Sequence, residues 1–254
     1  MTRPAPIFRL LALLALLCRV GVASAAGPPV LRIAVASNFA GPARELAARF
    51  EAKQGVRVLL AFGSTGKHAA QIEHGAPFAL FLAADAERPR RLEASGRAVA
   101  GTRATYALGR LVLWSPEPGR VDATGEVLAR GEFERLAIAN PRLAPYGRAA
   151  REALEALGLW ERLAPRTVRG ENIAQAHQFV ESGNAELGLV AASQVLRPGR
   201  EAPGSSWEVP ARLHGPIEQQ AVLLEDTPAA RAFLAFLLGE EAGEIIQRWG
   251  YGRR

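Results

Sequence analysis

The sequence predicts an α/β protein of two lobes joined by a hinge, and two features of the chain indicate it. Strand-like runs alternate with helix-like runs from residue 30 onward, which is typical of parallel strands connected by right-handed helical crossovers. Two strands, near Tyr106 and near Ile217, each follow a loop where the chain can pass between lobes. Two such crossings place residues 26–107 and 218–254 in one lobe and residues 108–217 in the other.

The first 25 residues are typical of a secretory signal peptide and are excluded from the fold. Arg3 and Arg9 supply its charge, residues 10–18 its apolar run, and Ala23, Ser24 and Ala25 a small-residue cleavage site. The apolar run is shorter than the roughly 20 apolar residues that span a bilayer. We therefore predict a protein that is exported to the periplasm and cleaved near Ala25.

The composition excludes several kinds of site and partner. Cys18 is the only cysteine and leaves with the signal peptide, so the mature chain has no disulfide, thiolate metal site or cysteine nucleophile. A lipid anchor on Cys18 is disfavoured because two leucines, not a small residue, precede it. Loss of Arg3, Arg9 and Arg19 reduces the net charge from +6 to +3. We expect no nucleic-acid partner, because the arginines are scattered among acidic residues rather than clustered with aromatic ones.

In the first half of the chain, turn residues bound each predicted element. A β-branched run predicts a strand at residues 30–36, and apolar residues spaced for one helix face predict a helix at residues 42–50. Gly75 ends the next helix. The further strands are predicted at residues 56–62, 79–83 and 108–114, and the further helices at residues 67–74 and 87–95.

The second half follows the same pattern. Gly158 and Gly183 end helices at residues 147–157 and 173–181, as glycine commonly does just past a helix. Strands are predicted at residues 136–139, around Val168, and at residues 187–191 and 217–224. Residues 197–206 are rich in proline and glycine and predict a loop, and one long helix is predicted at residues 228–249.

Four predicted helices begin directly after strands, on small polar residues or glycine. The first N–H groups of a helix have no partner within it and lie at the positive end of its dipole, so they bind an anion without a lysine or arginine. In open α/β sheets these starts gather at the carboxyl ends of the strands. Taken singly, Ser37, Asn38 and Ser64 are more simply explained as ordinary helix caps, and the pattern alone leaves the ligand open. The four starts are Ser37-Asn38, Ser64-Thr65-Gly66, Tyr146-Gly147 and Glu171-Asn172-Ile173.

Four runs of the sequence resemble one family. The runs are VASNFAGPARELAARFEAKQG, FGSTGKHAAQIEHGAPFALFLAAD, LAIANPRLAPYGRAAREALEALGLW and RGENIAQAHQFVESGNAELGLVAASQV. They are similar to the periplasmic molybdate-binding proteins of molybdate ABC transporters, over nearly all of the mature chain and in the same order. The resemblance implies a type II periplasmic-binding-protein fold with a hinged cleft, and a monomer that captures molybdate or tungstate for an ABC permease in the inner membrane. It also implies no enzymatic activity and no cofactor, since molybdenum is bound only as its oxyanion.

Carried over motif by motif, the resemblance implies six oxyanion-binding residues. Some family members place a coordinating tyrosine where this chain has Ala191, and we expect the hydroxyl or N–H of Tyr146 to compensate. Asp85 and Glu171 are the nearest carboxylates in sequence, and we expect Asp85 to cap the following helix. The six residues are Ser37, Asn38, Ser64, Thr65, Tyr146 and, through its backbone N–H, Ile173.

Other chemistries are disfavoured by the residues. Residues 61–68 approach a phosphate-binding P-loop, but His68 stands where a serine or threonine must bind magnesium. The four histidines show no metal-ligand spacing, and no G-x-S-x-G nucleophile turn is present. Two alternatives are still open. One is a binding protein for another oxyanion or for a small organic acid, with Arg169 as the nearest arginine, and the other is a secreted hydrolase.

Overall fold

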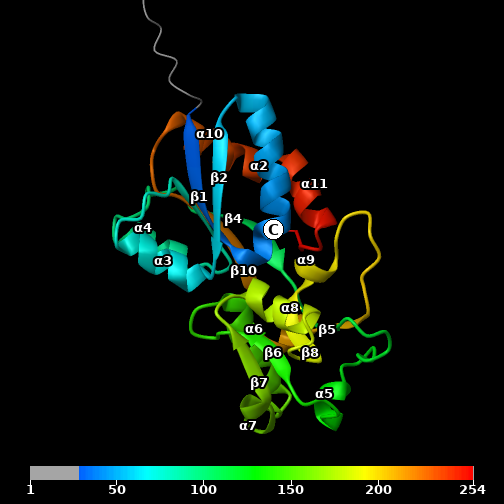
Figure 1. The fold of residues 1–254 in the computed structure, drawn as a ribbon. Coiled ribbons are helices and arrows are strands. Elements are labelled where there is room, and N and C mark those ends of the chain that lie inside the picture. Colours follow the sequence, from blue (N-terminus) through cyan, green and yellow to red (C-terminus); the bar gives the residue numbers. More distant parts are fainter. Residues whose placement is uncertain (1–28, 254) are drawn as a thin grey trace, which may run out of the picture.

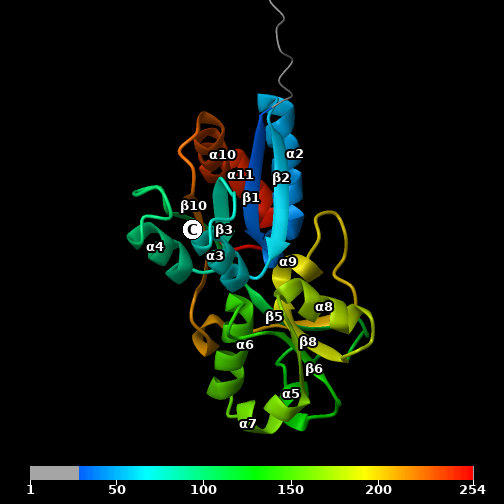
Figure 2. The ribbon, with the colours of Figure 1, turned by 60° about the vertical axis from the view of Figure 1, so that its left-hand side comes forward.

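The computed structural model describes residues 29–253, so the predicted signal peptide and its cleavage near Ala25 lie outside the described residues. The described chain forms two lobes, each built on a five-stranded sheet. In Figures 1 and 2 the two ends of the described chain share one lobe, and the middle of the chain forms the other. The predicted two-lobed α/β fold is confirmed.

The first lobe contains the sheet with strand order β2-β1-β3-β10-β4. Its strands are β1 (Val30–Ala36), β2 (Arg57–Gly63), β3 (Leu80–Ala83), β4 (Ala104–Gly109) and β10 (Ile217–Leu223). A 3-10 turn, η1 (Ser37–Phe39), follows β1. Helices cover both faces of the sheet. One face carries α2 (Ala40–Gln54), α10 (Pro228–Leu238) and α11 (Glu240–Arg248), and the other carries α3 (Thr65–Glu73) and α4 (Glu87–Ala94).

The second lobe contains the sheet with strand order β7-β6-β8-β5-β9. Its strands are β5 (Leu111–Ser115), β6 (Leu136–Ala139), β7 (Thr167–Gly170), β8 (Leu187–Ala191) and β9 (Ser205–Glu208). Two longer helices, α6 (Pro145–Ala156) and α8 (Ile173–Glu181), pack on this sheet. The shorter elements are α5 (Val127–Arg130), α7 (Trp160–Leu163), η2 (Ala164–Arg166), α9 (Ala192–Val195) and η3 (Ala211–Leu213).

The predicted parallel pairing holds for only part of each sheet. β1 is parallel to β2 and β3, and β6 is parallel to β7 and β8. The prediction is wrong for β10, which is antiparallel to β3 and β4, and for β5, which is antiparallel to β8 and β9. Both strands reach their sheet from the other lobe rather than through a helical crossover, so the handedness rule for crossovers does not constrain their direction.

The chain passes from the first sheet to the second between Gly109 and Leu111, and returns between Glu208 and Ile217. The predicted single strand at residues 108–114 is therefore wrong, since it is divided between β4 and β5. A Cβ on Gly109 would lie 2.4 Å from the Tyr146 hydroxyl oxygen. Only glycine lets Tyr146 pack against the end of β4 at this crossing.

Two other predicted segments differ from the structure. The predicted helix at residues 228–249 is two helices, α10 and α11, because Gly239 between them has an extended conformation with ψ 169°. The predicted loop at residues 197–206 contains the first residues of β9, a short strand at the edge of its sheet. The helices α5, α7 and α9 were not predicted, because four residues are too few to show a helical period.

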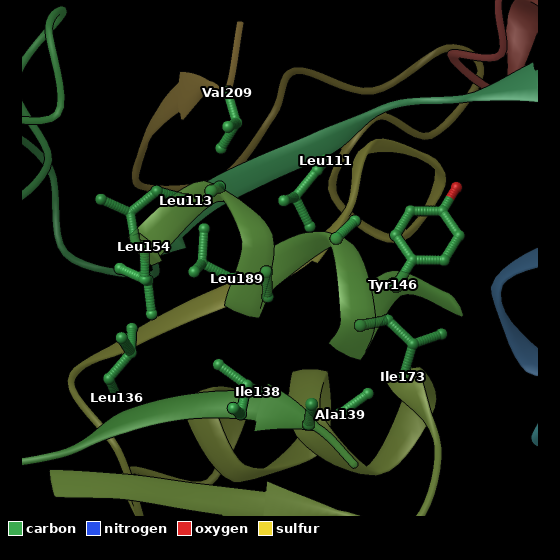
Figure 3. Close-up of a cluster of buried hydrophobic side chains, with 14 of the residues drawn as sticks. Leu111, Leu113, Leu136, Ile138, Ala139, Tyr146, Leu154, Ile173, Leu189 and Val209 are labelled. Atoms are coloured by element: carbon green, nitrogen blue, oxygen red, sulfur yellow. The ribbon is translucent and has the colours of Figure 1, made fainter. Parts of the chain in front are cut away.

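Each lobe has its own buried core. In the first lobe Leu31, Ile33 and Val35 face α2, α10 and α11. In the second lobe the core lies between the sheet and α6, where Leu113, Ile138 and Leu189 meet Leu154 (Figure 3). Burying each such side chain contributes about 1.5–3 kcal/mol. The core of the second lobe extends to Ala36 and Ala84 of the first lobe, so buried apolar contacts also join the two lobes.

Candidate anion-binding site

The four predicted helix starts lie beyond the carboxyl ends of four strands. η1 follows β1, α3 follows β2, α6 follows β6 and α8 follows β7. Because β1 is parallel to β2 and β6 is parallel to β7, the two starts of each lobe share one edge of its sheet. In Figures 1 and 2 these two edges lie where the lobes meet.

Ser37 joins the first helix start to the start of α8 across the two lobes. Its Oγ donates to Asn172 Oδ1 at 3.1 Å and accepts from the Ala174 N–H at 3.4 Å. Asn172 caps α8 by accepting from the N–H groups of Ala174 and Gln175. The first amide of the helix, that of Ile173, lies outside this cap. The Ser37 hydroxyl and the Ile173 N–H, from opposite lobes, are therefore brought together.

The start of α3 meets the loop before α6. The Gly66 N–H donates to Leu143 O at 2.8 Å, and a Cβ on Gly66 would lie 2.9 Å from the same oxygen. α6 begins at Pro145, which has no N–H, so the first amide that this helix presents is that of Tyr146. The second pair of helix starts thus also meets across the lobes.

One continuous buried cluster lies beneath the helix starts. It contains Ala36, which precedes Ser37, and Ala84, whose N–H donates to Thr65 Oγ1 at 3.1 Å. It also contains Tyr146 and Ile173 themselves. Each of the six predicted site residues is at most 6% exposed. Their donors are therefore held in a place from which bulk water is largely excluded.

The hydroxyl groups of Ser64 and Thr65 have different roles. Ser64 caps α3 by accepting from the Lys67 N–H at 3.3 Å, so the explanation as an ordinary cap is correct for Ser64. It is not correct for Ser37 or Asn38, since neither side chain caps α2. Thr65 Oγ1 accepts from Ala84, which leaves its own hydrogen to donate.

The Asn38 carboxamide is engaged away from the helix starts. Its Nδ2 donates to Gln219 Oε1 at 2.7 Å and to the Tyr251 hydroxyl at 2.9 Å. Both hydrogens of the carboxamide nitrogen are thus used. Of the Asn38 hydrogen-bond donors, only the backbone N–H is left to face a ligand.

The Tyr146 hydroxyl is buried at the crossing between the lobes. It has no hydrogen-bond partner among residues 29–253, and Figure 3 shows it pointing away from Ile173. Burial, together with the neighbouring Tyr251 and Tyr106, raises the Tyr146 pKa well above its ordinary value. The hydroxyl is therefore neutral at physiological pH, and the Tyr146 group directed toward the helix starts is its N–H.

The nearest carboxylates are paired with cations. Asp85 is buried, forms an ion pair with Arg88 and accepts from the Arg88 N–H at 3.0 Å. It thus satisfies an amide in the first turn of α4, as expected of a cap, but from the residue before the N-cap position, which is Ala86. Glu171 pairs with Lys67 Nζ at 2.8 Å, at the rim between the lobes. No group of three or more metal-ligating side chains occurs in residues 29–253. The donors gathered at the helix starts are uncharged amides and hydroxyls.

Sequence reasoning missed the residues that support these donors. Ser193, Gln219 and Tyr251 contact Asn38 from 155 to 213 residues away in the chain, and no local pattern indicates such contacts. Beside Ser37 and Asn38 a hollow of about 530 Å³ opens between the lobes. Arg169, the arginine considered for an organic acid, instead lines a hollow of about 340 Å³ on the second lobe. Within the described part of the chain, no helix is long and apolar enough to cross a membrane.

Known proteins are similar to this chain in both sequence and fold. The profile of the bacterial extracellular solute-binding proteins matches residues 31–252. The chain is 50% identical over 234 residues to the molybdate-binding protein ModA of Azotobacter vinelandii, which covers 91% of this chain and 93% of that protein. It is 48% identical over 241 residues to ModA of Rhodobacter capsulatus, covering 94% and 93%. The solved structure of the Azotobacter vinelandii periplasmic molybdate-binding protein superposes with a TM-score of 0.86 at 41% identity, covering 88% of this chain and 99% of that one.

Proposed function

The chain belongs to the bacterial extracellular solute-binding proteins, in the family of the ModA molybdate-binding proteins, and on this premise we propose that it captures molybdate or tungstate in the periplasm. It is a binding protein rather than an enzyme, needs no cofactor and acts as a monomer. It delivers the oxyanion to an ABC permease in the inner membrane.

One observation carries the proposal: helix starts from two lobes meet with uncharged donors and no unpaired carboxylate. The Ser37 bond to Asn172 and the Gly66 bond to Leu143 join the lobes at this place. In the proposed site, the oxyanion lies among the Thr65 hydroxyl and the N–H groups of Asn38, Tyr146 and Ile173, and the Ser37 hydroxyl joins them by turning its hydrogen from Asn172 to the anion. Ser64 supports the site by holding the start of α3.

Neutral donors explain the proposed selectivity. A buried donor without a partner costs about 1–3 kcal/mol, so a site lined with donors disfavours an anion that cannot reach them all. The shorter bonds of sulfate would leave several donors stretched. Hydrogen phosphate also carries a hydroxyl that needs an acceptor, and the carboxylates of Asp85 and Glu171 are already paired.

The proposed mechanism is closure of the two lobes around the anion. Donors come from both lobes, so the anion makes its full set of hydrogen bonds only in the closed form. A ligand shifts a conformational equilibrium only through such a difference in affinity. The two chain crossings, one at Arg110 and the other between Glu208 and Ile217, act as the hinge. The permease then recognises the closed form.

Calorimetric titration of the mature protein tests the proposal. Molybdate and tungstate should bind with a nanomolar dissociation constant, which corresponds to about 12 kcal/mol, and sulfate and phosphate should bind far more weakly. Melting curves with the same anions should rise with ligand concentration in the same order. Equal binding of sulfate and molybdate would refute the selectivity, and stabilisation by organic acids alone would refute the oxyanion.

A further inference from the structure

The carbonyl oxygen of Asn38 accepts hydrogen bonds from two hydroxyl groups. Ser193 Oγ donates to it at 2.8 Å and the Tyr251 hydroxyl donates to it at 2.8 Å. The Tyr251 hydroxyl also accepts from Asn38 Nδ2 at 2.9 Å. All three residues are at most 5% exposed. The carbonyl clamp, as we call Ser193 and Tyr251, therefore works in a place shielded from water.

The clamp fixes the backbone of the first helix start. A carbonyl oxygen has two lone pairs, and here both are occupied, so the plane of the peptide after Asn38 is held from two sides. This peptide lies within η1, whose Ser37 and Asn38 are placed at the proposed anion site.

The two halves of the clamp come from different lobes. Tyr251, which follows α11, and Asn38, which follows β1, both belong to the first lobe. Ser193 lies in α9 of the second lobe, whose first amide, that of Ala192, donates to Arg110 O at the crossing. The bond from Ser193 to Asn38 therefore depends on how the lobes are placed, whereas the bond from Tyr251 does not.

We propose that Ser193 is a positioning residue for the oxyanion: by bonding the Asn38 carbonyl across the lobes, it orients the first helix start in the closed form and so contributes to anion affinity. This inference rests on the proposed function. It assigns to Ser193 and Tyr251 a role that requires no contact with the anion.

The test is the dissociation constant for molybdate of Ser193→Ala, beside the melting temperature of the ligand-free variant. Removing one neutral hydrogen bond should weaken binding about fivefold and speed anion release, with little change in the ligand-free melting temperature. A purely structural role would lower the melting temperature and leave the dissociation constant unchanged. Ser182→Ala is the matched control, because Ser182 Oγ donates to Gln178 O at 2.8 Å within one lobe.

Tyr251→Phe and the double variant with Ser193→Ala provide an independent measurement. Each single variant leaves one bond on the Asn38 carbonyl, whereas the double variant leaves it buried and unpaired. The double variant should therefore lose more affinity than the product of the two single losses. Tyr106→Phe is the control, since the buried Tyr106 hydroxyl has no hydrogen-bond partner among residues 29–253.

The outcomes separate the clamp from the proposed function. If the wild-type protein binds molybdate but Ser193→Ala binds it equally well, the clamp is refuted and the proposed function stands. If the single losses simply multiply in the double variant, the shared carbonyl is refuted as the point of action. If the wild-type protein binds no oxyanion at all, both proposals fail.

Discussion

Replacing Gly66 with alanine should weaken anion binding while stabilising the ligand-free protein. Gly66 is the second residue of α3, where alanine is favoured over glycine by up to about 1 kcal/mol. That gain applies whether the lobes are open or closed. In the arrangement of the lobes seen in the structure, however, the added Cβ would lie 2.9 Å from Leu143 O and 3.1 Å from Leu143 Cα, a contact that is lost when the lobes open. The two forms should thus respond in opposite directions.

The size of the effect follows from the contact. The Leu143 oxygen belongs to the backbone of the other lobe and cannot rotate away as a flexible side chain would, so the lobes must separate by a few tenths of an ångström. This weakens the 2.8 Å bond from the Gly66 N–H. A lost neutral hydrogen bond and the residual strain together amount to about 1–2 kcal/mol, which raises the dissociation constant for molybdate about 5- to 30-fold.

Calorimetry and a thermal melt measure the two effects separately. Gly243→Ala is the matched control, since Gly243 lies within α11 with nothing within 4 Å of the added Cβ. It should raise the melting temperature and leave the dissociation constant unchanged. Wild-type affinity in Gly66→Ala would refute the argument that closure brings the start of α3 against the loop before α6.

Three further predictions concern single residues and pH. Ile173→Pro keeps the first helical position but removes its N–H, so calorimetry should show about 10- to 100-fold weaker molybdate binding, whereas Ile173→Val, which keeps the N–H, should bind nearly as wild type. Burial lowers the pKa of His68 from 6.5. Below pH 6.5 the unfolded chain therefore binds a proton on this side chain more readily than the folded protein does, so the free energy of unfolding is full above pH 6.5 and falls below it. The melting temperature should thus drop on acidification, and less steeply in His68→Gln. Burial raises the pKa of Tyr106, Tyr146 and Tyr251 above 10, so stability is full below pH 10 and declines above it. Tyrosinate absorbance should then appear only as the protein unfolds, and a rise at pH 10 in the folded protein would contradict their burial.

The elements predicted well are those that residues close together in the sequence specify. β1, β6, β8 and α8 have the predicted bounds, because a β-branched run or a helical period bounded by turn residues is sufficient to specify each of them. The division at Gly109 was not predictable in this way. The glycine is required there by the Tyr146 hydroxyl, which lies far along the chain and fills the place of a Cβ.

In the candidate site, too, the features with a local cause were predicted and those that depend on distant residues were not. The positions of Ser37, Thr65 and Ile173 at helix starts follow from strand and turn patterns, and the structure brings these starts together. The engagement of the Asn38 carboxamide by Gln219 and Tyr251 depends on pairings between distant strands and the end of the chain. The periodicity of a single segment does not encode such a contact. Only the assembled fold therefore reveals that the Asn38 donor available to a ligand is its backbone N–H.

The position of β10 imposes an order on assembly. This strand lies between β3 and β4, yet residues 217–223 come after the whole second lobe. A chain that emerges with its N-terminus first therefore leaves one edge of β3 unpaired, and open to association with other chains, until more than four-fifths of its length has appeared. The five strands of the second lobe, β5 to β9, follow one another in the chain and precede β10, so they can form their sheet before β10 appears. The first lobe, whose strands appear earliest, is therefore the last to be completed.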